Sequence, residues 1–430
     1  MKHFYLLFSF LTLLTLGISC SNDETEPVVN PITYHINPID YMSTTRPYPA
    51  SNNHIDTPAP EGYEPVFMFH LGRHGSRFHT KDSIENIIHD FLGEAKSAQA
   101  FTPLGEELLA AFNKHHNMFQ AGMLTPLGAR EHQGIAERMF KRFPQLFNGD
   151  TRIVARSTKK SRCACSMVNF VNTLRNLDNS MTVTMDSAHY DVESYLKNVI
   201  RIYDTQPLID AYNQRHPLDE SFFAKNVFKA SYYDNNKEKV AAMFPNIIEM
   251  MRYFYTEDHD TAIIRRVIPE KEWITFFKRY NFDVFESYRS TQPEYTKRLV
   301  GYTSLILDSL TTISDRQVSA QKPDTNLYLH FSHDTFIIPL LVMLNLDGTD
   351  HQYSAEEVYP DYDSTKMMPM GTNLQFIFYR NSQGHVLLKV LFNEDECKLG
   401  NLDTIKGCYY DWEKVKQYFA QRKQKYPLPL

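Results

Sequence analysis

The chain has 430 residues, of which 42% are hydrophobic and 22% charged, as is usual for a globular protein with one large core or two lobes. Its net charge of −6 argues against a general nucleic-acid-binding protein, which would normally carry an excess of positive charge on one face. A small anionic ligand is not excluded, since a local basic pocket can exist within an acidic protein.

Residues 1–20 have the pattern of an export signal. Lys2 precedes an apolar run over residues 4–18, which is too short to span a bilayer comfortably. A small residue before Cys20 resembles a bacterial lipoprotein cleavage site, so we expect a signal peptide over residues 1–20 and acylation at Cys20. The protein would then be exported to the periplasm or outer surface and would touch the membrane only through this lipid. Secretion without an anchor is the alternative. Residues 21–60 would form a polar tether and N-terminal extension.

The next part of the chain alternates predicted strands and helices. Residues 65–71 form an apolar run that predicts a buried strand, and residues 152–155 predict a second one. Helical spacing of apolar residues predicts helices over residues 102–112, 125–143 and 161–174. The second of these helices begins with Thr-Pro, a capping residue followed by a proline in the first turn.

A change of composition follows. Residues 177–308 are rich in Tyr, Phe, Asn and Lys and show helical patterns, so we expect a helical cap region there. Strand signals return at residues 327–331, and a hairpin is predicted from residues 374–379 and 386–392. The predicted fold is therefore α/β, with a mostly parallel sheet flanked by helices. Its core would comprise residues 61–176 and 309–430, with the mainly helical cap inserted between them.

The cysteines suggest one disulfide and no metal. Cys397 and Cys408 could close a short loop in an exported protein, whereas Cys163 and Cys165 are too close in sequence for an unstrained bridge. No CxxC pair or histidine-rich motif is present, so the sequence predicts no metal site and no cofactor.

Three polar clusters each follow the end of a predicted strand, at residues 73–77, 156–158 and 332–334. Ligands of open α/β sheets bind beyond the carboxyl ends of the strands, so the three clusters could form one pocket. Arginines can hold the oxygens of a phosphate ester, a neutral imidazole can attack phosphorus, and a carboxylic acid can protonate the leaving group. These residue types therefore favour phosphoryl transfer without a metal ion.

The same residues resemble the motifs of a known family. Arg73-His74-Gly75-Ser76-Arg77 is similar to the signature of the histidine acid phosphatases, and His333-Asp334 is similar to their second motif. Residues 124–128 (LTPLG) resemble a helix-start motif between the two. Residues 156–163 resemble the arginine segment of the multiple inositol polyphosphate phosphatases. That branch usually has His-Ala-Glu at the acid motif, whereas His333-Asp334-Thr335 is like the fungal and enterobacterial phytases.

The resemblance implies roles for individual residues. His74 would be the nucleophile that forms a phosphohistidine, and Asp334 would be the general acid. The phosphate-binding residues would be Arg73, Arg77, Arg156 and His333. We also expect His79, Lys159 and Lys160 at the rim of the substrate site, where the basic run 159–162 could contact outer phosphates.

The function predicted on this basis is hydrolysis of a small phosphomonoester, with phytate or another inositol polyphosphate as the expected substrate. A broad-specificity acid phosphatase acting on sugar phosphates or nucleotides is one alternative. A lipoprotein that binds phosphate esters without turnover is another, although a pure binder would need neither His74 nor Asp334.

Overall fold

The structure is a computed structural model that describes residues 34–49, 54–187, 204–257 and 259–429. The predicted signal peptide, Cys20 and most of the predicted tether lie outside the described residues. One mixed sheet of eight strands forms the centre of the fold. The strands are β1 Glu64–Arg73, β2 Arg152–Ser157, β3 Thr182–Ser187, β4 Leu327–Ser332, β5 Asn373–Arg380, β6 Val386–Phe392, β7 Asp395–Glu396 and β8 Tyr409–Asp411.

The strand order is β3-β2-β4-β1-β5-β6-β7, and β8 pairs with β6. Neighbours from β3 to β1 are parallel, whereas β5, β6, β7 and β8 add antiparallel pairs at the other side. The predicted α/β class is therefore confirmed, and β5 and β6 form the predicted hairpin. The parallel half brings the carboxyl ends of β1, β2 and β4 to the same edge.

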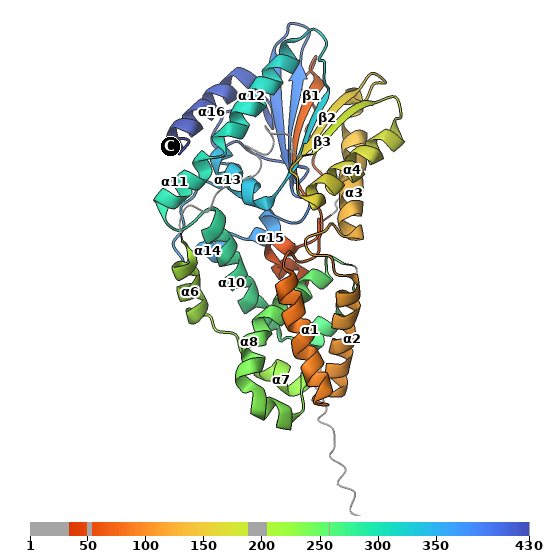
Figure 1. Cartoon of the computed structure of the whole chain (residues 1–430). Helices are drawn as coiled ribbons and strands as arrows, with labels where there is room; N and C mark the ends of the chain where they lie inside the picture. Colours follow the sequence, from red (N-terminus) through yellow and green to blue (C-terminus); the bar gives the residue numbers. More distant parts are fainter. Residues whose placement is uncertain (1–33, 50–53, 188–203, 258, 430) are drawn as a thin grey trace, which may run out of the picture. The chain divides into compact units, whose positions relative to one another are not determined.

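Two helical layers cover the sheet (Figure 1). Side chains of α3 and α4 pack with one face, and side chains of α11, α12, α13 and α16 pack with the other. Figure 1 shows α3 and α4 beside β2 and β3, and α12 and α16 on the opposite side. The bounds of these helices are α3 Pro126–Arg142, α4 Ser161–Leu177, α11 Pro293–Gly301, α12 Ser304–Ser319, α13 Asp334–Leu344 and α16 Trp412–Lys425.

A separate apolar cluster holds the helical cap together. It includes side chains of α1, α2, α7, α8, α9 and α10, which lie beyond one end of the sheet in Figure 1. The remaining helices are α1 Asp82–Ser97, α2 Pro103–Met118, α6 Gln206–Arg215, α7 Ser221–Val227, α8 Ala230–Phe254, α9 Ala262–Val267, α10 Glu270–Tyr288, α14 Val358–Asp361 and α15 Ser364–Met367. Short 3-10 helices span Pro38–Tyr41, Ser43–Thr45 and Pro144–Leu146.

The cap differs from the predicted region 177–308 in two ways. The strand β3 falls inside that range but pairs with β2 in the core sheet. The helices α1 and α2, which precede the range, pack in the cap cluster. The cap is thus built from two segments of the chain, and their association is a matter of tertiary packing that local patterns do not reveal.

The local sequence explains why α3 begins at Pro126. The hydroxyl oxygen of Thr125 accepts a hydrogen bond from the amide of Gly128 at 3.2 Å, and Pro126 occupies the first turn. This is the predicted capping arrangement, and it places α3 directly behind the end of β1. No helix within the described ranges combines the length and the apolar character that a membrane span requires.

Candidate active site

The three predicted polar clusters meet at one edge of the sheet. The pairing register places Arg73 at the end of β1 beside Ser332 at the end of β4. Ser157 at the end of β2 lies beside Phe331 of β4. The residues that follow these strands therefore surround a common space, as the sequence predicted.

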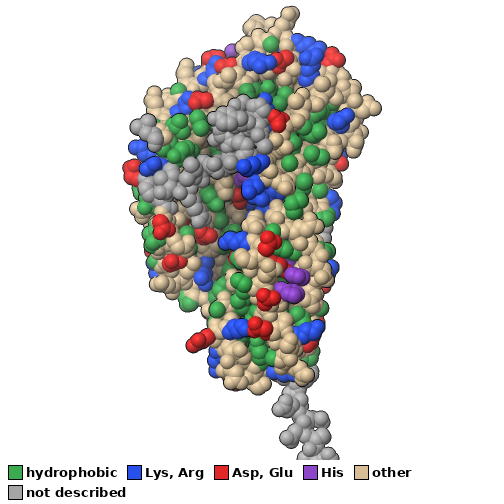
Figure 2. Space-filling model, in the orientation of Figure 1, with side chains coloured by type: hydrophobic (Ala, Val, Ile, Leu, Met, Phe, Trp, Pro, Cys, Tyr) green, Lys and Arg blue, Asp and Glu red, His purple; other side chains and the backbone are tan. Residues whose placement is uncertain are grey.

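That space is a pocket with a volume of about 580 Å³, within the usual range for a small-molecule site. Lys and Arg side chains gather beside a hollow in the middle of the face drawn in Figure 2. Residues from the core loops form one wall, and residues of the cap helix α10 form the other. The lining comprises Thr44, His74, Arg77, Thr80, Thr158, Lys159, Lys160, Arg162, Tyr280, Asp283, Val284, Ser287, Tyr288, His333, Asp334 and Thr335.

Close packing on α3 fixes the loop that carries His74 and Arg77. A Cβ atom on Gly75 would lie 2.5 Å from the carbonyl oxygen of Gly128, and one on Gly128 would lie even closer to the carbonyl oxygen of Ser76, so both positions require glycine. The buried Glu131 carboxylate accepts hydrogen bonds from the Ser76 amide at 2.6 Å and from the Ser76 hydroxyl at 2.7 Å. The loop is thus held rigidly against the helix, which favours a preorganised site.

The imidazole of His74 is in the form that a nucleophile needs. Its Nδ1 lies 2.9 Å from the carbonyl oxygen of Gly75, which can only accept, so Nδ1 carries the proton and Nε2 has the free lone pair. Burial, together with the positive charges of Arg162, Arg73 and Arg77, holds the pKa of His74 well below its ordinary value. The ring is therefore neutral across the physiological pH range.

Three guanidinium groups surround this histidine with unused hydrogen-bond donors. The Nε atoms of Arg73, Arg77 and Arg162 are all buried, and none has a hydrogen-bond partner among the described residues. A buried donor without a partner costs about 1–3 kcal/mol, and Arg77 and Arg162 line the pocket. Their unpartnered donors beside His74 therefore indicate a site built to receive an anion.

Asp334 lies at the first turn of α13 and is paired with Arg73. Its Oδ2 accepts a hydrogen bond from the Arg73 guanidinium at 2.7 Å, and its Oδ1 accepts one from the Thr335 amide at 2.9 Å. Burial alone would raise the pKa of Asp334, but Arg73 and Arg77 outweigh it and hold that pKa below its ordinary value. The carboxyl group is therefore ionised when the pocket holds no anion.

His333 stands between Asp334 and the α4 side of the pocket. Its ring lies edge-on to that of His74, with the centroids 5.6 Å apart. Its Nε2 lies 3.1 Å from the Thr158 hydroxyl, and a guanidinium nitrogen of Arg162 lies 3.5 Å from its Nδ1. Burial and the charge of Arg162 lower the pKa of His333 to about 3. The predicted set of His74, Arg73, Arg77, His333 and Asp334 is thus brought together.

The arginine that lines the pocket beside Arg77 is Arg162, not the predicted Arg156. Arg156 is not among the described residues that line the pocket. Its neighbours Ile153 and Ala155 point into the cluster beside α3 and α4, so alternation along β2 turns Arg156 to the opposite face of the sheet. Arg162 lies in the first turn of α4 and reaches back to the pocket.

Of the three predicted rim residues, Lys159 and Lys160 line the pocket and His79 does not. His79 is 3% exposed, and its Nε2 lies 3.1 Å from a carboxylate oxygen of Glu249. Its ring also lies edge-on to Tyr253. After Phe78 the chain turns into the cap, and the side chain of His79 is held there by α8.

The predicted disulfide between Cys397 and Cys408 is not formed, and both residues are buried free thiols. Cys397 packs in the apolar cluster on one face of the sheet, and Cys408 packs in the cluster on the other face. Although both lie beside β6, their side chains point to opposite sides, which prevents the geometry that a disulfide requires.

Motif reasoning did not find several residues of the site. The buried Glu131 that holds Ser76 lies three residues beyond Gly128, and nothing in its local pattern marks it. The α10 residues Tyr280, Asp283 and Ser287 share one helical face, but no local pattern shows that this face forms a pocket wall. Arg162 belonged to the basic run 159–162, which was the available signal for it.

Three buried histidines lie beneath the site and make the fold sensitive to acid. Burial is the main cause that lowers the pKa of His70, His132 and His330 to about 3. In the unfolded chain the pKa of each histidine is ~6.5. Between pH ~3 and pH ~6.5 the unfolded state therefore binds more protons than the folded state. The free energy of unfolding should therefore be unaffected above pH ~6.5 and fall as the pH decreases below it.

A single variant checks this prediction. Each histidine should contribute a slope of up to ~1.4 kcal/mol per pH unit below pH 6. Replacing His70 by Leu should remove its share of the slope in urea unfolding measured from pH 7 to pH 4. Parallel curves for the parent and His70→Leu would contradict the prediction.

Comparison with known proteins agrees with the motifs. The model of the histidine phosphatase superfamily (branch 2) matches residues 67–393. The multiple inositol polyphosphate phosphatase 1 of Gallus gallus is 24% identical over 387 residues, covering 84% of this chain and 82% of the relative.

Solved structures show the same fold. The Bifidobacterium longum multiple inositol polyphosphate phosphatase in complex with inositol hexasulfate matches with a TM-score of 0.67 and 17% identity, covering 88% of this chain and 97% of the other. The phytase from D. castellii matches with a TM-score of 0.64 and 13% identity, covering 97% and 93%. At these identities the structural likeness concerns the fold alone.

Proposed function

This chain belongs to the histidine phosphatase superfamily (branch 2) and is a phosphoric monoester hydrolase, and we propose that it removes phosphate from inositol polyphosphates such as phytate through a phosphohistidine on His74. The observation that carries this proposal is the set of unpartnered, buried guanidinium donors around the free Nε2 of His74. An anion held by these donors would present its phosphorus to that nitrogen.

The first chemical step is attack by Nε2 of His74 on phosphorus. The neighbouring arginines keep the imidazole neutral, and they also stabilise the charge that develops on the phosphoryl oxygens. The bond from phosphorus to the ester oxygen breaks as the new nitrogen–phosphorus bond forms. The leaving alkoxide takes a proton, and the proposed donor is Asp334, a carboxyl group that lines the pocket and is bound to Arg73.

The role of Asp334 as an acid depends on the bound substrate. Without an anion, Arg73 and Arg77 hold its pKa low. A phosphate dianion beside the same arginines offsets their charge, so the pKa of Asp334 rises when the substrate binds. After the alcohol leaves, the resulting carboxylate is placed to take a proton from the water that hydrolyses the phosphohistidine.

The basic rim favours a substrate with several phosphates. Lys159 and Lys160 are exposed at the mouth of the pocket, and Arg162 lies deeper on the same side. The relatives named for inositol polyphosphates support the same substrate class. Purified protein should therefore hydrolyse phytate with a higher kcat/KM than glucose 1-phosphate or a nucleoside monophosphate. Equal or lower kcat/KM for phytate would instead indicate a broad-specificity acid phosphatase.

Replacing Arg162 by Ala tests whether this arginine, rather than Arg156, binds the phosphate. Loss of a charge-assisted hydrogen bond of about 1.5–3 kcal/mol corresponds to a 10- to 100-fold decrease in kcat/KM. Arg156→Ala is the matched control, because Arg156 does not line the pocket, and it should keep kcat/KM within about twofold. The opposite ranking of the two variants would restore Arg156 as the phosphate-binding residue.

The proposed location is an exported protein that is anchored through a lipid on Cys20. The support is the pattern of residues 1–20. In a bacterial host, the parent should partition with membranes and take up labelled fatty acid. Cys20→Ala should lose the label and leave the membrane fraction. Unchanged membrane association of this variant would exclude acylation at Cys20 as the anchor.

A further inference from the structure

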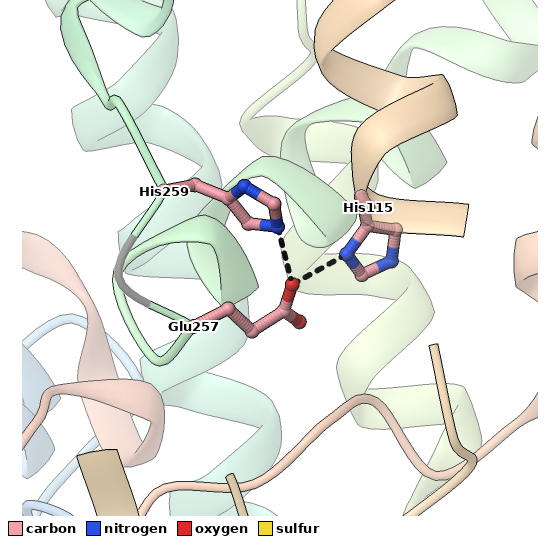
Figure 3. Close-up of side chains that lie close together, drawn as sticks. All are labelled: His115, Glu257 and His259. Carbon is pink, nitrogen blue, oxygen red and sulfur yellow. Dashed lines mark hydrogen bonds and ion pairs between the residues drawn. The ribbon is translucent and has the colours of Figure 1, made fainter. Parts of the chain in front are cut away.

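A group of three potential metal ligands lies in the cap, outside the phosphate pocket (Figure 3). His115 comes from the last turn of α2, while Glu257 and His259 come from the segment after α8. Nδ1 of His115 lies 2.6 Å from Oε2 of Glu257, and Nε2 of His259 lies 3.0 Å from the same oxygen. Figure 3 shows both rings pointing toward this carboxylate. None of the three lines the pocket described above.

The group is buried and only partly satisfied by hydrogen bonds. The side chains of His115 and Glu257 are fully buried, and that of His259 is 4% exposed. Oε1 of Glu257 and Nε2 of His259 have no hydrogen-bond partner among the described residues. The contact of His259 with Oε2 is thus close but lacks hydrogen-bond geometry. His115 is hydrogen-bonded to Glu257, but these two other ligand atoms are left without a hydrogen-bond partner, as expected of buried atoms that receive a cation.

A second carboxylate orients one of the histidines. Nε2 of His115 lies 3.0 Å from Oε2 of Glu85, which is 3% exposed. Without a metal, both ring nitrogens of His115 donate to carboxylates, Nδ1 to Glu257 and Nε2 to Glu85. A cation would displace the proton on Nδ1, while the proton on Nε2 would remain donated to Glu85. Metal-bound histidines commonly hold their other nitrogen against a carboxylate in this way, because it fixes the ring and its tautomer.

We propose that His115, Glu257 and His259 bind a divalent transition cation of the zinc type. Two imidazole nitrogens and one carboxylate oxygen form a donor set that such ions accept, and three protein ligands leave one position for water. The sequence did not predict this site because His115 and Glu257 are 142 positions apart and form no local motif.

The cation would support the phosphate-binding loop from behind. Thr256, next to Glu257, donates its hydroxyl to the carbonyl oxygen of Arg77 at 3.0 Å. Thr125, the cap of α3, donates its hydroxyl to the carbonyl oxygen of Thr256 at 2.7 Å. A metal at Glu257 would therefore tie the end of α2 to the segment that positions Arg77. This role is structural, since the three ligands do not face the substrate.

Cobalt binding to the full-length protein tests the site. Protein stripped with a chelator and then dialysed should bind one Co²⁺ per chain, with the visible absorption bands of a tetrahedral complex, and Zn²⁺ should displace it. Both metals should raise the Tm by several degrees. His259→Ala and Glu257→Gln should lose the absorption bands and the Tm increase.

His351→Ala is the matched control, because His351 is an exposed histidine outside the group, and it should bind Co²⁺ as the parent does. If Glu257→Gln fails to fold, His259→Ala carries the test, because its residue lies nearer the surface. The proposal is overturned if the parent binds no Co²⁺, or if His259→Ala binds it with the same absorption bands. The three residues would then form a buried ion-paired network without a metal.

Discussion

His74→Ala should lose phosphatase activity by on the order of 10⁴-fold or more in kcat while keeping the fold of the parent. Nε2 of His74 has a free lone pair beside the unpartnered arginine donors. The nitrogens of His333, the other imidazole of the described pocket, instead lie beside Thr158 and Arg162. Without the imidazole of His74, phosphorus could be attacked only by water, and no covalent intermediate could divide the reaction into two easier steps.

The measurement is steady-state release of phosphate from phytate, with circular dichroism and thermal unfolding as checks of the fold. The exposed His89→Ala serves as the control for histidine removal and should retain the activity of the parent. Retention of near-normal turnover by His74→Ala, with the fold intact, would rule out the proposed nucleophile.

Asp334→Asn should lose much more activity on substrates whose leaving group must be protonated than on substrates whose leaving group departs as a stable anion. An inositol alkoxide is a poor leaving group, so the first step on phytate should slow by ~10²–10⁴-fold. An aryl phosphate releases a stabilised phenolate and barely needs a proton, so its first step should slow much less. The variant also removes the charge that pairs with Arg73.

Pre-steady-state kinetics separate the two steps of this reaction. With an aryl phosphate, Asp334→Asn should release a burst of phenolate and then turn over slowly, because the same carboxyl group is the proposed base for water. Equal slowing of the first step for aryl phosphate and phytate would mean that Asp334 is not the acid. Asp334 would then serve mainly to hold Arg73 and the Thr335 amide in place.

The parts of the structure that follow local rules were predictable from the sequence. The two apolar strands and the Asn-Ser-Gln-Gly turn of the β5–β6 hairpin, and the Thr-Pro start of α3, both appear as expected. The grouping of residues 73–77 with residues 332–334 also followed from strand ends alone, since parallel strands bring their carboxyl ends to one edge.

The features that were missed depend on tertiary structure. β3 has an edge position and an exposed pattern, so its residues 182–187 give no strong apolar signal. Arg156 and Arg162 are both arginines near the end of β2, and only the alternation of that strand and the start of α4 decide which one reaches the pocket. The pocket wall formed by α10 and the group of His115, Glu257 and His259 arise only when the cap helices pack together, so local patterns do not reveal them.

Rapid quenching of the enzyme during turnover of ³²P-labelled phytate tests the central claim most directly. The phosphohistidine mechanism predicts protein-bound label within a single turnover, and this label should survive base and be released by acid, as a phosphorus–nitrogen bond would be. The label should map to the peptide that contains His74 and should be absent from His74→Ala. Turnover by the parent without any labelled protein, or a label that persists in His74→Ala, would contradict the account.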